Sequence, residues 1–398
     1  MIPKEKKVVS IIGGGAAALV CAYFLDPAKY DVTIYEKNKA LARKFLVAGK
    51  GGFNLTHSEP IAELIERYTP SGFLREALLG FDNTAVRNWL SDLGIPTYIG
   101  SSKRVYPEKE IKPIEVFNSI IAKLNERGVQ LRYEHTWTGW NDVGNLKFNS
   151  DTAIQSDYTI FALGGASWKI TGSDGNWTNY FKNHSVITLP FQASNCAYQV
   201  DWSKEFLSKF EGVPLKNIAI DCNGSYQKGE VVITQFGLEG NAIYALSPQV
   251  RAELSSNSTA TIHLDLKPNQ DEEQLLQKLE NSPAKNTADK LRTALKLSTV
   301  QVGLIKEIVS KEAYLDPKQL VQFIKRLPLD VLSSAPLDEA ISTVGGIALT
   351  EVDANFELSK LKHHYCIGEM LDWDAPTGGY LLQACFSMGH HVAQHLNK

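Results

Sequence analysis

Residues 8–36 of the chain read VVSIIGGGAAALVCAYFLDPAKYDVTIYE. The β-branched run at 8–12 predicts a strand, the Ala- and Leu-rich run at 16–25 predicts a helix, and 31–36 predicts a second strand. Three consecutive glycines, Gly13 to Gly15, separate the first strand from the helix. This order of strand, glycine turn, helix and strand predicts a βαβ unit of the Rossmann type.

The glycine turn fits the pattern G-x-G-x-x-A and predicts a phosphate-binding turn. Gly13 permits the tight turn, and Gly15 lets the backbone approach a pyrophosphate. The helix start at Ala16 and Ala17 offers free N–H groups and a partial positive charge to phosphates. Glu36 ends the second strand, where a carboxylate accepts hydrogen bonds from the ribose hydroxyls of an adenosine. The motif therefore predicts a cofactor that contains ADP, and it does not distinguish FAD from NAD.

A second glycine-rich segment, at 44–57, reads KFLVAGKGGFNLTH. Three glycines in four residues favour close backbone approach to a ligand, and a surface loop is the alternative interpretation. The basic residues Lys44 and Lys50 are candidates to neutralise phosphate. From this segment and from the end of the second strand we expect the cofactor to be contacted by Lys37, Lys44, Gly51, Gly52 and Asn54.

Two further segments carry glycines at the end of a strand. Residues 159–167 read TIFALGGAS, and 366–384 contain CIGEMLD followed by TGGYLLQA, where a glycine pair opens a helix. In many flavoproteins the acid of such a turn binds the ribitol chain. The helix N-terminus then stabilises the negative charge that builds at flavin N1 and O2 on reduction. The candidate residues here are Leu163, Gly164, Gly165, Gly368, Glu369, Asp372, Thr377, Gly378, Gly379 and Tyr380.

Together these segments resemble a family of bacterial FAD-dependent oxidoreductases with two dinucleotide-binding-type lobes. Its members include aminoacetone oxidases and reductases of unsaturated bile-acid intermediates. The resemblance covers nearly the whole chain, including TQFGLEG at 234–240. Many relatives carry Arg-Cys-Asn after the second glycine run, where this chain has Gly52-Phe53-Asn54, so no role of that Arg or Cys is transferred. The resemblance implies that FAD lies near Gly13, Gly15, Glu36, Gly164, Asp372 and Gly379.

The pattern changes near Pro190 and changes back near residue 343. Short alternating segments at 195–201, 217–222, 229–235 and 259–265 are typical of an all-β or barrel-like domain, and 271–325 reads as helical. We therefore predict an α/β protein whose Rossmann-type FAD-binding domain is built from both chain ends. The expected domains are the FAD-binding domain (1–190 and 341–398), an inserted β-barrel-like domain (191–268 and 329–340) and a small helical domain (269–328).

Composition narrows the class of protein. The chain has 398 residues and a net charge of −3, with no strongly basic stretch, which argues against a nucleic-acid partner. No apolar run reaches the roughly 18–20 residues of a membrane span. Five scattered cysteines without a CxxC pair indicate reduced thiols and argue against a flavin disulfide reductase. We expect a cytoplasmic protein with a small-molecule substrate, no membrane association and no metal, and the oligomeric state stays open.

The leading functional hypothesis is an FAD-dependent oxidoreductase that passes hydride between a small organic substrate or NAD(P)H and flavin N5. NAD(P)H would be a transient donor, because no second G-x-G-x-x-G marks a dedicated nicotinamide domain. One alternative is an NAD-dependent dehydrogenase, against which the glycine-opened C-terminal helix argues. Another is a non-catalytic flavin-binding protein, against which the large insert argues. The catalytic group stays unknown, and the candidate acid–base residues are His57, His184, His363 and His364.

Overall fold

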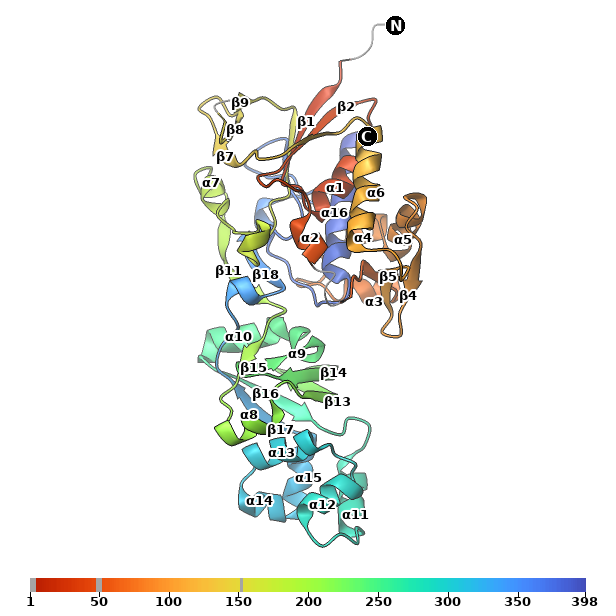
Figure 1. Ribbon diagram of the computed structural model, residues 1–398. Coiled ribbons are helices and arrows are strands. Elements are labelled where there is room, and N and C mark those ends of the chain that lie inside the picture. The colour runs from red at the N-terminus through yellow and green to blue at the C-terminus, as the bar shows by residue number, and fades with distance from the viewer. Residues whose placement is uncertain (1–4, 48–51, 151–152) are drawn as a thin grey trace. The chain divides into compact units, whose positions relative to one another are not determined.

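The computed structural model describes residues 5–47, 52–150 and 153–398 (Figure 1). The chain divides into two compact units. The first combines the residues up to Ala193 with Leu337–Lys398, and the second is Ser194–Pro336. The first unit therefore contains both ends of the described chain, and the second is a single continuous insertion. The division of the insertion into separate β-rich and helical domains stays a prediction.

A five-stranded parallel sheet forms the centre of the first unit. β1 is the middle strand, and its last four residues are buried, which is typical of a parallel strand covered on both faces. The edge strand β19 comes from the C-terminal part of the chain, so the Rossmann-type sheet is built from both ends, as predicted. The order is β19 (His364–Cys366), β10 (Tyr158–Phe161), β1 (Lys7–Ile12), β2 (Tyr30–Tyr35) and β6 (Gln130–Arg132).

Two helices that begin at glycines pack against each other in this unit. Figure 1 shows α1 (Ala16–Phe24) beside α16 (Tyr380–Asn397), which are joined by direct contacts. Gly389 makes the close approach possible, because a Cβ there would lie 2.4 Å from the Ala17 carbonyl oxygen. The other helices of the unit are α2 (Arg43–Val47), α3 (Ile61–Ile65), α4 (Arg75–Gly80), α5 (Asn83–Asp92), α6 (Pro113–Glu126) and α7 (Thr178–Lys182).

Three small sheets complete the first unit. Most of their strands were not predicted, because strands of two to four residues are too short to show an alternating pattern. One sheet has the order β3 (Thr56–His57), β5 (Arg104–Pro107) and β4 (Thr97–Ile99). The others are β7 (Trp137–Trp140) with β8 (Leu146–Phe148) and β9 (Ala153–Ile154), and β11 (Thr188–Ser194) with β18 (Ser342–Ile347).

The second unit contains a six-stranded antiparallel sheet that curls on itself. The Gln199 N–H of its first strand donates to the Ser333 carbonyl at 2.8 Å, and the Leu332 N–H donates to the Gln199 carbonyl at 2.9 Å. The first strand is thus also bonded to the segment that follows the last strand, which confirms the barrel-like prediction. The order is β12 (Tyr198–Gln199), β15 (Gly237–Glu239), β14 (Ser225–Ile233), β13 (Pro214–Cys222), β16 (Ala260–Asp265) and β17 (Leu327–Val331).

The helical prediction for 271–325 is also confirmed. The segment forms α11 (Glu272–Glu280), α12 (Thr287–Thr293), α13 (Thr299–Ile308), α14 (Lys311–Leu315) and α15 (Pro317–Lys325). A side chain accepts a hydrogen bond from the first turn of each helix, which explains why the run breaks into short helices. These capping residues are Asp271, Asn286, Ser298, Ser310 and Asp316. Three helices in the unit were not predicted, α8 (Lys204–Phe210), α9 (Asn241–Tyr244) and α10 (Ser247–Asn257).

Candidate functional site

The turn between β1 and α1 leaves an open approach at Gly15. A Cβ on Gly15 would meet nothing within 4 Å, and no side chain caps the helix at this residue. Gly13 differs, because its φ is +98° and a Cβ would lie 2.4 Å from the Ala162 carbonyl oxygen. In the described part of the chain, the N–H groups of Ala16 and Ala17 donate no hydrogen bond. The turn therefore presents free donors toward a space that a side chain at Gly15 would fill.

Glu36, which follows β2, is hydrogen-bonded to this turn. Its carboxylate is 8% exposed, and Oε2 accepts a hydrogen bond from the Gly14 N–H at 3.0 Å. Oε1 accepts from the backbone N–H of Asn38 at 2.8 Å and from its side-chain amide at 2.7 Å. The sequence predicted Glu36 as a ribose acceptor, and the structure adds a second role in holding the glycine turn.

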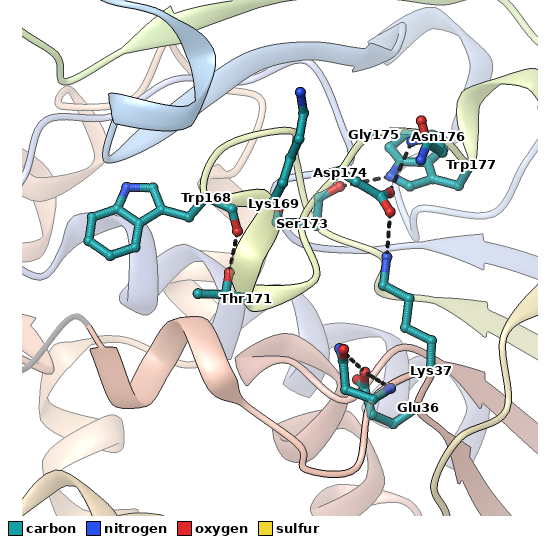
Figure 2. Close-up of polar contacts among 12 residues, drawn as sticks. Glu36, Lys37, Trp168, Lys169, Thr171, Ser173, Asp174, Gly175, Asn176 and Trp177 are labelled. Carbon is teal, nitrogen blue, oxygen red and sulfur yellow. Dashed lines mark hydrogen bonds and ion pairs between the residues drawn. The ribbon is translucent and has the colours of Figure 1, made fainter.

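Lys37 joins the end of β2 to the loop at 168–177. Its Nζ lies 2.9 Å from Asp174 Oδ2, and both side chains are about one-third exposed (Figure 2). Gly172 in the same loop approaches Asn38 so closely that a Cβ would lie 2.5 Å from the Asn38 side-chain nitrogen. Lys37 is therefore paired with a carboxylate, and the loop at 168–177 lies against the residues that follow β2, where the sequence predicts the adenosine.

Lys44 brings three of the glycine segments together. Its Nζ lies 2.9 Å from Glu369 Oε2 and 2.8 Å from the Ser167 hydroxyl. Glu369 follows Gly368, and Ser167 follows the glycine pair after β10, so one ammonium group links the segments 44–57, 159–167 and 366–384. Lys44 was predicted to neutralise phosphate. In this structure its charge is balanced by the largely buried Glu369 carboxylate.

The glycine pair after β10 packs tightly against β18. A Cβ on Gly165 would lie 2.2 Å from the Thr343 hydroxyl, which accepts a hydrogen bond from the Ala166 N–H at 3.1 Å. Gly164 has a φ of +72°, and its carbonyl accepts from the Trp177 indole N–H at 3.1 Å. Leu163, which precedes the pair, is only partly buried. The close packing against Thr343 leaves no room for a side chain at position 165, so a glycine is required there whether or not a ligand binds.

The turn after β19 contacts both the first helix and β18. Gly368 has a φ of +81°, and a Cβ there would lie 3.4 Å from the Ala17 methyl group. Asp372 Oδ1 accepts a hydrogen bond from the Gly345 N–H at 2.8 Å. In the described residues Asp372 Oδ2 has no hydrogen-bond partner, so one carboxylate oxygen stays available for a ligand.

A second uncapped helix begins at the glycine pair that follows Thr377. Gly378 and Gly379 have φ values of +117° and +105°, and a Cβ on Gly379 would lie 2.4 Å from the backbone of Thr56. No side chain caps α16, and the described part of the chain provides no acceptor for the Tyr380 N–H. Both helices that the sequence predicted as ligand-binding therefore start with free N–H groups.

The Tyr380 side chain belongs to a buried polar cluster. Its hydroxyl donates to Glu59 Oε1 at 2.7 Å, and Arg67 donates to the two oxygens of the same carboxylate at 3.2 and 3.0 Å. Burial alone would raise the pKa of Glu59, but the hydrogen bonds from Arg67 and Tyr380 hold that pKa below its usual value. Burial, together with the bond to Glu59, raises the Tyr380 pKa. The hydroxyl of Tyr380 is therefore committed to the protein rather than to a ligand.

The remaining predicted residues fall into three groups. Gly51 lies outside the described residues, as do Gly49 and Lys50. Gly52 has a φ of +108°, and its carbonyl accepts hydrogen bonds from the backbone and side chain of Asn54, which forms a local turn. Of the four candidate histidines, His57 lies beside the glycine pair that opens α16, and the other three make aromatic contacts elsewhere. His57 stacks on Tyr380, His184 and His364 pack against Trp140, and His363 contacts Tyr158.

Sequence reasoning missed three residues at these turns. Thr56 contacts Gly379, Ser167 binds Lys44, and the Arg104 side chain lies against Gly378, where a Cβ would meet its Nε at 3.2 Å. Thr56 and Ser167 lie within the quoted segments 44–57 and 159–167 but were not picked out as contacts, and Arg104 lies outside all of the quoted segments. Among the described residues, no group of three His, Cys, Asp or Glu side chains could hold a metal ion. No helix in the described ranges has both the length and the apolar character needed to cross a membrane.

Comparison with known proteins identifies the family. The model of the HI0933-like protein Rossmann domain matches residues 7–395. The chain belongs to the HI0933-like family. This result confirms the resemblance inferred from the sequence, because the family is related to FAD-dependent oxidoreductases.

Curated relatives of this HI0933-like chain match it over nearly its whole length. A ribosomal RNA dihydrouridine synthase from Haemophilus influenzae is 24% identical over 410 residues, covering 98% of each chain. A 3-dehydro-bile acid delta(4,6)-reductase from Clostridium scindens is 23% identical over 407 residues, covering 96% of this chain and 97% of the relative. These proteins differ in their named substrates, so the family alone does not assign one.

Among solved structures, the HI0933-like chain shares its fold with a steroid enzyme. The 3-ketosteroid-delta4-(5alpha)-dehydrogenase from Rhodococcus jostii RHA1 superposes with a TM-score of 0.50 at 13% sequence identity. The match covers 100% of this chain and 98% of that chain. At this identity the likeness concerns the fold alone, and it agrees with the predicted α/β class with an inserted β-rich domain.

Proposed function

We propose that the chain is a flavin-dependent reductase that binds FAD non-covalently on its first unit and saturates a ring carbon–carbon double bond conjugated to a carbonyl. One observation supports FAD above all. Two helices, α1 and α16, start at glycines without a side-chain cap, and they pack together through Gly389. A dinucleotide with a flavin needs a donor-rich site at each end, for the pyrophosphate and for the pyrimidine ring.

The residues present fit the cofactor. The open side of Gly15 and the free N–H groups of α1 suit a pyrophosphate, since a side chain at Gly15 would occupy that space. Glu36 lies at the end of β2, where ribose hydroxyls can donate to its carboxylate beside the bonds that it already accepts. Asp372 keeps one oxygen for the ribitol chain, and the start of α16 suits the pyrimidine end. When bound, FAD supplies hydride transfer at flavin N5 between NAD(P)H and the substrate.

The proposed substrate class comes from the relatives' names. Dihydrouridine is uridine with its ring double bond saturated, and a delta(4,6)-reductase saturates ring double bonds of a 3-dehydro steroid. In both molecules such a bond is conjugated with a carbonyl group. A reductase of this kind takes hydride from NAD(P)H and delivers it to the β-carbon, while a proton completes the α-carbon.

A free small molecule is the preferred form of the substrate. The net charge of −3 and the absence of a strongly basic stretch argue against tight binding to a phosphate backbone. The relatives named for ribosomal RNA make a uridine within RNA the second candidate, which revises the expectation that nucleic acid plays no part. The two candidates share one reaction, so a single assay can compare them.

Anaerobic reduction of the purified, FAD-loaded chain tests the proposal. NADH or NADPH should bleach the band at about 450 nm, and a cyclic enone, free uridine or uridine-containing RNA should restore it. Restoration by an enone alone supports the small-molecule form, and restoration by RNA alone supports the second candidate.

Reduction by an amine, with no response to any conjugated carbonyl, would overturn the substrate class. A folded chain that binds NAD but no FAD would indicate an NAD-dependent dehydrogenase. A loaded chain that no donor reduces would indicate a flavin-binding protein.

A further inference from the structure

Arg104 lies beside the glycine pair that opens α16. It is the first residue of β5, directly opposite His57 of β3 in the sheet register, and its side chain is partly buried. A Cβ on Gly378 would lie 3.2 Å from Arg104 Nε and 3.7 Å from Nη2. The guanidinium group therefore borders the space that a side chain at Gly378 would occupy, close to the start of the helix.

Among the described residues, no carboxylate pairs with the charge of Arg104. Across the described ranges, no hydrogen bond or ion pair is formed by its guanidinium group. The nearby carboxylate of Glu59 is already engaged, since Arg67 binds both of its oxygens and Tyr380 donates to one of them. His57 cannot supply a counter-charge, because an imidazole ring is either neutral or positive, and burial lowers its pKa despite the nearby Glu59 carboxylate.

Partial burial removes some of the water around the Arg104 charge, and among the described residues no anion compensates for that loss. The helix start next to it adds positive potential of the same sign, from the free N–H group of Tyr380 and the helix dipole. Two positive features side by side, with no anion of the described protein between them, indicate that the anionic partner is supplied by a ligand. At the pyrimidine end of a bound flavin, negative charge develops on reduction.

We propose that Arg104 contacts the pyrimidine end of the flavin and, with the first turn of α16, stabilises the negative charge that reduction places at N1 and O2. The inference rests on the proposed FAD function and deepens it. Arg104 lies outside every recognised motif. In this proposal it shares with the helix start the task of stabilising the negative charge of the reduced flavin. The charge of Arg104 should therefore raise the reduction potential of the bound flavin.

The test is the reduction potential of the FAD-loaded protein with Arg104→Gln, compared with the unchanged chain. Removing the cation should lower the affinity for reduced relative to oxidised flavin about tenfold, which corresponds to about 30 mV for a two-electron couple. Arg104→Lys should restore part of the loss, because it keeps the charge and loses the planar fork. Lys109→Gln is the matched control, since it removes one exposed positive charge from the same segment and should leave the potential unchanged.

Different results separate this inference from the proposed function. Failure of the unchanged chain to bind FAD would refute the proposed function itself. A loaded Arg104→Gln protein with the potential of the Lys109→Gln control would refute the role of Arg104 and leave FAD binding intact. A normal potential with a raised KM for the conjugated carbonyl would also overturn it, by assigning Arg104 to the substrate. If Arg104→Gln does not fold, Arg104→Met keeps the apolar stem and replaces it in the same comparison.

Discussion

The Glu36 carboxylate holds the backbone of Gly14, with 3.0 Å between Oε2 and the amide nitrogen. A residue at the end of β2 thereby fixes the glycine turn that follows β1. The same carboxylate is expected to face the adenosine ribose, so one side chain would orient both the cofactor and the turn that receives its pyrophosphate. Glu36 is only 8% exposed and already accepts three hydrogen bonds, which leaves acceptor capacity for a ligand.

The first prediction concerns Glu36. Glu36→Ala should weaken FAD binding by about 1–3 kcal/mol, because ribose hydroxyls and the Gly14 N–H would both lose their acceptor. It should also lower the thermal stability of the apoprotein, which a ligand-only role would leave unchanged. Glu36→Gln keeps one acceptor oxygen, so its FAD affinity and thermal stability should lie between those of the unchanged chain and of Glu36→Ala. An unchanged FAD dissociation constant in Glu36→Ala, from titration of the apoprotein, would show that the adenosine binds elsewhere.

The second prediction separates two neighbouring glycines. Gly15 has an extended backbone, and a Cβ there meets nothing within 4 Å, so Gly15→Leu should fold normally and lose FAD. Gly13→Ala should instead destabilise the protein by about 1–3 kcal/mol, because its φ is +98° and the Cβ would strike the Ala162 carbonyl. Thermal unfolding and bound flavin are measured on each preparation. Stoichiometric FAD in folded Gly15→Leu would exclude the pyrophosphate from this turn.

The third prediction concerns the contact between the two glycine-opened helices. Gly389→Ala should cost about 1–3 kcal/mol of stability, since the new methyl group would lie 2.4 Å from the Ala17 carbonyl oxygen and force α1 away from α16. FAD affinity should fall with it, because the start of α1 would shift. Gly80→Ala is the control, as Gly80 ends α4 with nothing within 4 Å and should be neutral or slightly stabilising. Equal unfolding temperatures for the two variants would contradict the close packing.

The fourth prediction concerns pH and His390. Burial lowers the pKa of His390 to about 4, and the positive charge of His391 adds to the effect. Its ring stacks on Phe81 with centroids 4.5 Å apart. The unfolded chain binds this proton near pH 6.5, so stability should be lost as the pH falls from about 6.5 to about 4. His390→Phe should reduce that loss by on the order of 2–3 kcal/mol. Parallel stability curves for both proteins below pH 6 would contradict the assignment.

Local sequence was sufficient for the Rossmann core. β1, α1 and β2 follow from residues 8–36 alone, because the strand pattern, the glycine turn and the helix are all encoded within one short segment. The helical run at 271–325 was equally visible, since it is rich in Lys, Glu, Leu and Ala and has few helix breakers, although its division into five helices was not predicted. The barrel-like sheet was recognised from alternation, although α9 and α10 within the insertion were not.

The details of the site depend on contacts between distant residues. Lys44 and Glu369 are 325 positions apart, and their ion pair follows from the fold rather than from any motif. Thr56 and Gly379 are in contact because β3 packs against the start of α16, and no pattern in either segment predicts that contact. Arg104 was missed for the same reason, since an arginine in a four-residue strand resembles any surface cation until the neighbouring backbone is known.

FAD binding itself is tested by the absorption spectrum of the purified chain after incubation with FAD and removal of free cofactor. We expect a band at about 450 nm, with close to one FAD released per chain on denaturation, and loss of that band in Gly15→Leu. A well-folded chain that retains no flavin, or one whose flavin content is the same in Gly15→Leu, would contradict it.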